Sequence, residues 1–212
     1  SSDAAGDWWA RVVGAGKALD TDRWAVLAPN LLGSCYGTTG PSDHPDGRFP
    51  AVTPRDQARF VSLLVEALGV REVALATGGS LGGMVALEWA ALSPRRPPAT
   101  VVLAAPAAHP AHAIARNAVQ RECLTAAGDA GVALARQISM IAFRTEREFE
   151  ARFARAVGPD GRFRVAGYLT HHGAKLAARF DAASYRTLLD AMDAHDIGRG
   201  RGGVARALRR LQ

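Results

Sequence analysis

Residues 73–84, which read VALATGGSLGGM, decide the fold of this chain. The short apolar run at 73–76 predicts a buried strand, and the apolar spacing of residues 84–91 predicts a helix. Between them lies the pattern GxSxG, centred on Ser80. This pattern predicts a sharp strand-to-helix turn with the serine hydroxyl exposed at its tip. Small residues two positions before and two positions after the serine are expected to let strand and helix approach closely.

Two further apolar runs extend this strand–helix unit in both directions. Residues 24–28 and 100–105 each predict a buried strand, and residues 53–68 predict a helix between the first two strands. Thr53 is a suitable N-cap for that helix, and Gly69 is a suitable residue to end it. Strands that alternate with helices are typical of a parallel sheet, so we expect all three strands to run parallel.

The chain changes character after Pro106. From about residue 112 to residue 210 the apolar residues recur at helical spacing, and only residues 163–165 suggest extended chain. A helical block that follows a strand–helix core predicts a lid over a site. The run GRGRGG at 198–203 predicts a flexible basic link into a last short helix.

The position of Ser80 predicts a nucleophile of the α/β-hydrolase type. The backbone N–H of Leu81, at the start of the next helix, is expected to face the oxyanion that forms during acyl transfer, aided by the positive helix end. The alternative is a serine that only caps the start of a helix, with or without a bound phosphate. The patterns GxxxxGK[ST] and GxGxxG are absent from this loop, which disfavours the phosphate version.

A nucleophilic serine needs a histidine base and an orienting acid, which follow the serine along the chain in this fold. The histidines that follow it here are His109, His112, His171, His172 and His195. None of them lies in a loop after a late strand, where the fold places the base. For His171, His172 and His195 we expect solvated or capping roles instead.

The composition fits a soluble globular chain with one core and an inserted lid. The chain has 212 residues, and no run approaches the roughly 20 apolar residues of a membrane span. Two cysteines without a CxxC pair favour neither a disulfide framework nor a metal site, and they agree with a cytoplasmic protein. The net charge of +6 keeps nucleic-acid binding as the less favoured alternative, because arginines and acids are mixed, as in residues 144–148.

Several separated motifs resemble the homoserine O-acetyltransferase family, and they run from Trp8 to about Arg199. The matching stretches are residues 8–9 (WW), 13–21 (VGAGKALDT), 30–41 (NLLGSCYGTTGP), 78–84 (GGSLGGM), 87–89 (LEW), 135–138 (ARQI), 179–181 (RFD) and 184–185 (SY). The resemblance implies an α/β fold: an α/β-hydrolase-like parallel sheet core with a helical lid insertion.

The resemblance also implies a ping-pong reaction that belongs to methionine biosynthesis. Ser80 would take an acetyl group from the co-substrate acetyl-CoA and pass it to the hydroxyl of L-homoserine, without a cofactor. Arg136 occupies the position of an arginine that holds the carboxylate of the amino acid, although a plain helix-surface arginine is the alternative. The family usually has a tyrosine where this chain has Phe143, so one substrate contact is changed. Lids pack together in a homodimer in this family, and we expect the same here, with neither nucleic acid nor membrane as a partner.

By the same resemblance, residues 1–108 are expected to form part of the core, residues 109–198 the lid, and residues 199–212 the basic link and the start of the return to the core. In the family, one strand precedes the matched segment, and two strands that carry the aspartate and the histidine follow it. We therefore expect an incomplete core that is inactive by itself. In such a core, strand 24–28 would lie too far from strand 73–76 to pair with it directly.

Three kinds of function stay open on the sequence. Acyl transfer from a succinyl donor, or to serine or another hydroxyl, uses the same chemistry at Ser80. A hydrolase would form the same acyl-enzyme and release it with water, which an enclosing lid would exclude. A scaffold or dimerisation module that has lost its triad is the third. The stretches 41–49 and 121–131 are shorter than in the family, a difference that bears on substrate scope.

Overall fold

The computed structural model describes residues 8–44, 46–92 and 97–211. The chain forms two compact units, Ser1–Asn30 and Leu31–Gln212, and each is described by itself. Within the described residues, no helix is both long enough and apolar enough to cross a membrane.

The first unit, from residue 8 to residue 30, has little regular structure. It holds one short 3-10 helix, η1 (Trp8–Arg11), and a turn closed by a bridge between Val13 and Leu19. The strand predicted at 24–28 is not formed, and Trp24 is 53% exposed, so this prediction is wrong. A strand needs backbone hydrogen bonds to a neighbour, and an apolar run alone does not provide them.

The sheet of the second unit consists of β1 (Leu75–Gly79) and β2 (Ala99–Leu103). The two strands are parallel, with Leu75 opposite Ala99 and Gly79 opposite Leu103, which confirms their expected direction. β1 extends further along the chain than predicted, because the small residues of the motif continue the ladder with β2. Buried and half-buried residues alternate along β1, whereas Val101 and Leu103 of β2 are exposed, so the strand expected at 100–105 is formed but is not buried at these two positions.

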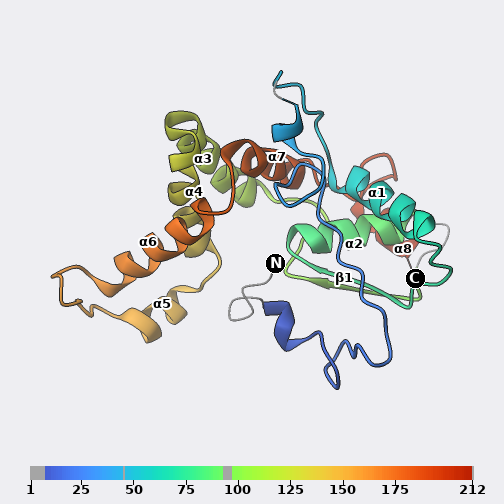
Figure 1. Cartoon of the computed structure of the whole chain (residues 1–212), viewed down its shortest axis with the longest axis horizontal. Helices are drawn as coiled ribbons and strands as arrows, with labels where there is room; N and C mark the ends of the chain where they lie inside the picture. Colours follow the sequence, from blue (N-terminus) through green and yellow to red (C-terminus); the bar gives the residue numbers. More distant parts are fainter. Residues whose placement is uncertain (1–7, 45, 93–96, 212) are drawn as a thin grey trace. The chain divides into compact units, whose positions relative to one another are not determined.

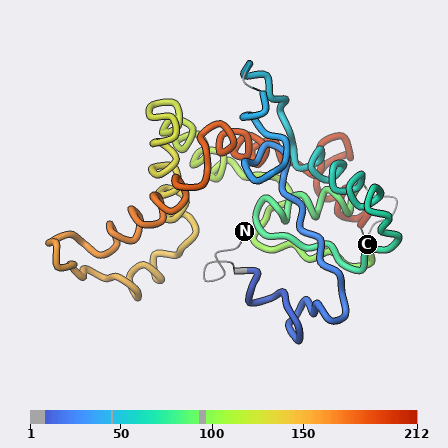
Figure 2. Tube along the Cα trace, viewed as in Figure 1, coloured from blue at the N-terminus to red at the C-terminus, as the bar shows by residue number. Residues whose placement is uncertain are grey.

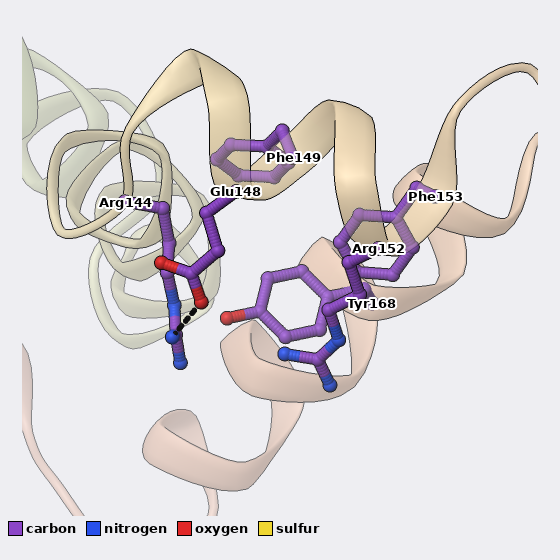
Figure 3. A pocket seen from close by; sticks show the side chains of 6 residues that line it. All are labelled: Arg144, Glu148, Phe149, Arg152, Phe153 and Tyr168. Atoms are coloured by element: carbon purple, nitrogen blue, oxygen red, sulfur yellow. Dashed lines mark hydrogen bonds and ion pairs between the residues drawn. The ribbon is translucent and has the colours of Figure 1, made fainter.

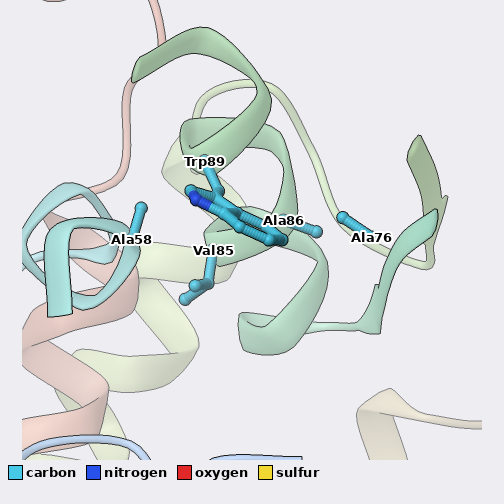
Figure 4. Close-up of a cluster of buried hydrophobic side chains, with 5 residues drawn as sticks. All are labelled: Ala58, Ala76, Val85, Ala86 and Trp89. Atoms are coloured by element: carbon cyan, nitrogen blue, oxygen red, sulfur yellow. The ribbon is translucent and has the colours of Figure 1, made fainter. Parts of the chain in front are cut away.

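Two helices pack beside this sheet, α1 (Pro54–Ala67) and α2 (Leu81–Leu92). The start of α1 is as predicted: Thr53 Oγ1 accepts from the N–H of Asp56, and Asp56 Oδ2 accepts from the N–H of Thr53. Small and apolar side chains fill the space between the helices and β1 (Figure 4). The members of this cluster are Ala58, Ala76, Val85, Ala86 and Trp89.

The lid consists of α3 (Ala111–Ala127), α4 (Asp129–Ala142), α5 (Glu146–Phe153), α6 (Arg164–Ala177) and α7 (Ala182–Asp193). α4 contacts α3, α6 and α7, and α5 contacts α6 (Figure 1). The apolar core of the lid contains Leu124, Val132, Ala135, Leu176 and Leu189. The extended chain suggested at 163–165 is wrong beyond Phe163, because Phe163 forms a single bridge with Val157 and α6 begins at the next residue.

The glycine-rich loop that opens the second unit contacts the lid. It contains a short 3-10 helix, η2 (Pro41–Asp43), that packs against α7. Gln57 holds the loop to α1, since its side chain accepts from the N–H of Leu32 at 2.9 Å and donates to the carbonyl of Leu32 at 2.7 Å. Gly33 has a φ of +84°, and a Cβ there would lie 2.5 Å from Thr187 Cγ2. Only glycine fits at this point of contact.

The two ends of the lid meet at a neck that joins it to the core (Figure 2). Ala108 and Asp196 form an antiparallel bridge, the N–H of His109 donates to the carbonyl of His195 at 2.9 Å, and the N–H of Ile197 donates to the carbonyl of Ala107 at 2.9 Å. Each side of the neck therefore fixes the position of the other.

The segment after the neck is anchored rather than a flexible link, which corrects the prediction for residues 198–203. Arg201 donates to Glu88 Oε2 at 2.8 Å and to the carbonyl of Ile197 at 2.8 Å. Glu88, on α2, is 2% exposed and also pairs with Arg55 of α1 at 3.2 Å. A buried carboxylate with two arginine partners thus ties α1, α2 and this segment together before α8 (Val204–Arg209) begins.

Candidate active site

Ser80 lies in the turn between β1 and α2, as the pattern GxSxG predicts. Its φ is +53°, a left-handed conformation that costs a non-glycine residue about 1 kcal/mol or more. Its N–H donates to the carbonyl of Leu103 in β2 at 2.9 Å, and its own carbonyl accepts from the N–H of Met84 at 3.1 Å. The strained turn is therefore held from both sides while the residue itself is exposed.

The predicted role in the close approach of strand and helix is confirmed for Gly78 and wrong for Gly82. A Cβ on Gly78 would lie 2.2 Å from the carbonyl oxygen of Gly82, so β1 and α2 can approach only with glycine there. A Cβ on Gly82 would meet nothing within 4 Å among the described residues, whereas one on Gly83 would lie 2.8 Å from Ala105 Cβ. The tight position after the serine is the third, not the second.

The N–H of Leu81 is available for an anion because of its place in the helix. Leu81 is the first residue of α2, and the first N–H groups of a helix have no acceptor within it. These groups carry the positive end of the helix dipole and lie next to Ser80. The arrangement can stabilise a negative oxygen that forms on a group attached to the serine.

No histidine or carboxylate among the described residues is hydrogen-bonded to the Ser80 hydroxyl. His195 is 3% exposed and lies in the neck, where its Nε2 is 3.0 Å from the carbonyl of Pro106, so the expectation of a solvated or capping role is wrong for it. Burial lowers the pKa of His195, and its Nδ1 is buried without a partner. His171 and His172 lie on α6, away from the turn in sequence. Among the described residues, the structure therefore shows no base for Ser80.

Arg136 lies on α4 and is half-buried in the lid. Its guanidinium carbon is 5.3 Å from the ring centroid of Phe143, which is 60% exposed. No carboxylate of the described residues pairs with Arg136, and burial lowers the pKa of its guanidinium. Arg136 makes no hydrogen bond to Ser80 in this structure, so its expected direction towards the serine stays a prediction.

A hydrogen-bonded network runs through the lid, and sequence reasoning missed it. Ser139 and Tyr185 both donate to Gln120 Oε1 at 2.7 Å, Gln120 donates to Asn117 Oδ1 at 3.1 Å, and Asn117 donates to Asp193 Oδ1 at 2.7 Å. Burial raises the pKa of Tyr185, which keeps its hydroxyl a donor. These residues form the lid network, which links α3, α4 and α7 to the neck.

The sequence contains a weak signal for the other missed residue, Glu88. It is an acid in a helix whose remaining residues are all apolar or small, and such an acid is buried with a partner or exposed at an edge. The partners Arg55 and Arg201 are far apart in sequence, so spacing alone does not connect the three.

The fold and the turn at Ser80 define a class of protein. Residues 3–122 match the family model described as alpha/beta hydrolase fold, and the chain belongs to this family. Among curated relatives, the chain is 45% identical to "Homoserine O-acetyltransferase" of Clavibacter michiganensis and 47% identical to the protein of that name from Thermobifida fusca. Each alignment covers 96% of this chain, and the chain spans 60% and 61% of the two relatives.

Solved structures agree with this placement. The crystal structure of homoserine O-acetyltransferase from Staphylococcus aureus is similar with a TM-score of 0.72 and 32% identity, over 86% of this chain and 53% of that one. Esterase E22 is similar with a TM-score of 0.78 and 22% identity, over 94% of this chain and 64% of that one, which shows the shared fold alone.

Proposed function

We propose that the protein transfers an acetyl group from acetyl-CoA to the hydroxyl of L-homoserine, a step towards methionine, through a covalent intermediate on Ser80. The observation that carries this proposal is the exposed serine in a left-handed turn at the start of α2. The names of the relatives at 45% and 47% identity support the choice of acetyl transfer among the reactions of this fold.

In the first half of the reaction, Ser80 Oγ attacks the thioester carbonyl and forms a tetrahedral oxyanion. The N–H of Leu81 and the positive end of α2 stabilise this oxyanion. The carbon–sulfur bond then breaks, the CoA thiol leaves with a proton, and the acetyl group remains on Ser80. We assign the base and its orienting acid to the share of the relatives' length that this chain does not span.

In the second half, the homoserine hydroxyl attacks the acetyl-serine, and Arg136 holds the carboxylate of the acceptor. A half-buried guanidinium without a carboxylate partner among the described residues favours an anion at that place. Phe143 offers Arg136 a ring face in place of the hydroxyl that the family's tyrosine has. We infer that this acceptor site relies on the guanidinium more than on a second hydroxyl.

The decisive test is acetylation of the complete protein. Acetyl-CoA should add one acetyl mass to the wild type and none to Ser80→Ala, while Ser184→Ala, which removes a buried hydroxyl in the lid, should keep the adduct. An adduct on Ser80→Ala would refute the nucleophile. If the adduct decays as fast in water as it does with homoserine, the hydrolase alternative replaces the transferase.

The acceptor site has its own test. Arg136→Ala should raise the KM for homoserine by roughly 10- to 100-fold, the usual effect of losing a hydrogen bond to a charged group. Arg136→Lys should recover only part of it, because an ammonium does not bind a carboxylate with two parallel hydrogen bonds. An unchanged KM in both variants would remove Arg136 from the site.

We also propose a cytoplasmic homodimer that forms through the lid. Val119 of α3 and Leu134 and Ile141 of α4 support it, because these apolar side chains are 53%, 51% and 55% exposed. Light scattering on the complete protein should give twice the monomer mass, and Leu134→Glu with Ile141→Glu should give the monomer.

A further inference from the structure

Basic side chains from three lid helices lie near one another. They are Arg136 of α4, Arg152 of α5, and His171, His172 and Lys175 of α6, and we call them the cationic cluster. α4 and α5 both pack against α6, which brings these side chains together.

Aromatic rings hold the cluster in place. The guanidinium carbon of Arg152 is 4.7 Å from the ring centroid of Tyr168 and 5.1 Å from that of Phe153. The rings of Tyr168 and His172 are 4.5 Å apart, and those of His171 and His172 are 5.3 Å apart. Figure 3 shows Arg152 beside Tyr168, between α5 and α6. The gap that Arg152, Phe153 and Tyr168 line together with Arg144, Glu148 and Phe149 is too small for a water molecule, so a ligand would lie on this surface rather than within it.

Two other arginines of the lid have carboxylate partners, and the cationic cluster does not include them. Arg121 pairs with Asp190 and Asp193, and Arg144 pairs with Glu148 of α5 (Figure 3). Among the described residues, no carboxylate pairs with Arg136, Arg152 or Lys175.

The pKa of His172 reflects the positive charges that surround it. Burial lowers its pKa first, and then His171, Arg136, Arg152 and Lys175 lower it further, so every charge that it senses is positive. Like charges at short range repel one another, and the arrangement is stable only where solvent or a bound anion screens it. The sum of these effects favours an anion at this place.

The amount of charge decides which anion fits. The homoserine of the proposed reaction brings one carboxylate and its own ammonium, a net charge of zero, and Arg136 alone suffices for that carboxylate. Arg152 and Lys175 add two permanent charges, and His172, whose pKa the neighbouring cations lower, can add another when an anion raises that pKa. A ligand with several phosphate charges matches this surplus, and guanidinium groups bind phosphates well.

We propose that the cationic cluster binds the phosphate groups of the acyl donor, the nucleotide end of acyl-CoA. This assignment rests on the proposed function, which supplies a donor with a phosphorylated nucleotide at one end and the thioester at the other.

The test compares a donor that has the phosphates with one that lacks them. In the complete protein, Arg152→Ala with Lys175→Ala should raise the KM for acetyl-CoA by roughly 10- to 100-fold, since charged hydrogen bonds are lost. The KM for acetyl-pantetheine, which has the same thioester and no phosphate, should not change, and neither should the KM for homoserine. Arg147→Ala, which removes an exposed charge from the same helix outside the cluster, is the matched control.

A binding measurement makes the result independent of acyl transfer. Adenosine 3′,5′-bisphosphate, titrated calorimetrically, should bind the wild type and the Arg147→Ala variant and lose at least tenfold in affinity in the double variant. Equal rises in KM for both donors, or unchanged affinity for the bisphosphate, would overturn the proposal. If inorganic pyrophosphate binds through the cluster but the KM for acetyl-CoA does not change, the site takes a free phosphate ligand and the donor assignment falls. If no donor acetylates the wild type while the bisphosphate still binds through the cluster, the proposed function fails and the phosphate site stands.

Discussion

The α/β part and the lid fix their structures by different means. Between β1 and α2 the contact depends on the absence of side chains, because a Cβ on Gly78 or Gly83 would lie 2.2 or 2.8 Å from its neighbour. In the lid, Leu124, Val132 and Leu189 form an ordinary apolar core, and the lid network adds polar contacts across it. Ser80 thus lies where Gly78 and Gly83 leave no room for an added carbon, while Arg136, the proposed substrate contact, lies in the part that side chains hold together.

Removing the buried charge of the α/β part should have the largest effect. Glu88→Ala leaves the largely buried arginines Arg55 and Arg201 without their carboxylate, and such losses cost about 3 to 5 kcal/mol. Urea unfolding of the complete protein, followed by circular dichroism, should show this loss. The exposed Glu66 on α1 is the control, and Glu66→Ala should change stability by about 0.5 kcal/mol at most. A mild effect of Glu88→Ala would mean that this carboxylate does not tie the segment after the neck to the core.

Alanine substitutions at the two glycines of the GxSxG pattern should have clearly different effects on stability. Gly78→Ala forces its methyl group against the backbone of Gly82, and overpacking of this kind costs about 2 to 3 kcal/mol. Gly82→Ala meets nothing and lies in a helix, so it should be neutral or stabilise the protein by about 0.5 to 1 kcal/mol. Equal losses in the unfolding midpoint for the two variants would contradict the contact seen at Gly78.

Adjacent hydroxyls on α7 test the lid network. Tyr185→Phe removes a donor to Gln120 and should cost about 1 kcal/mol, whereas Ser184→Ala removes a buried hydroxyl that has no partner among the described residues. The second variant should therefore be neutral or slightly more stable in the same unfolding measurement. The reverse order would show that the network contributes nothing to stability.

The smallest effect should come from pH at the neck. The pKa of His195 is lowered in the folded protein, mainly by burial, so the unfolded chain binds its proton more readily. Its contribution to stability is complete above about pH 6.5 and falls as the pH drops towards the lowered folded pKa. The thermal midpoint should thus decrease below pH 6.5 by less in His195→Gln than in the wild type. An identical pH dependence of the two proteins would exclude His195 as the cause.

The local parts of this structure could be predicted from the sequence, and the parts that depend on distant partners could not. The start and end of α1 at Thr53 and Gly69, the turn at Ser80 and the parallel pair β1–β2 all follow from residues within a short window. The segment 24–28 has the same apolar pattern as a buried strand, but pattern does not supply a neighbour.

The residues of the candidate site also fall into those that a local motif predicts and those that depend on distant partners. Ser80 and the N–H of Leu81 come from one motif, so their geometry is local. The pairing of Glu88 with Arg201 joins residues 113 positions apart, and the bond from Tyr185 to Gln120 joins residues 65 positions apart. Such pairs are fixed by how the helices pack, and no spacing rule along a single chain identifies them.

The bridge between Ala108 and Asp196 has a consequence for how such proteins diversify. Because the lid leaves and rejoins the core at one place, residues can be inserted or deleted within it without changing the gap that the core must close. Lengthening or shortening a loop between fixed ends changes its closure entropy only slowly, by about 0.6 kcal/mol per doubling. The tight junction at Gly128, where α3 passes directly into α4, lies in the stretch 121–131 that we expect to be shorter than in the family. The same strand-to-helix turn with its serine can in this way be combined with lids of many sizes. Substrate preference can then change while the serine is kept.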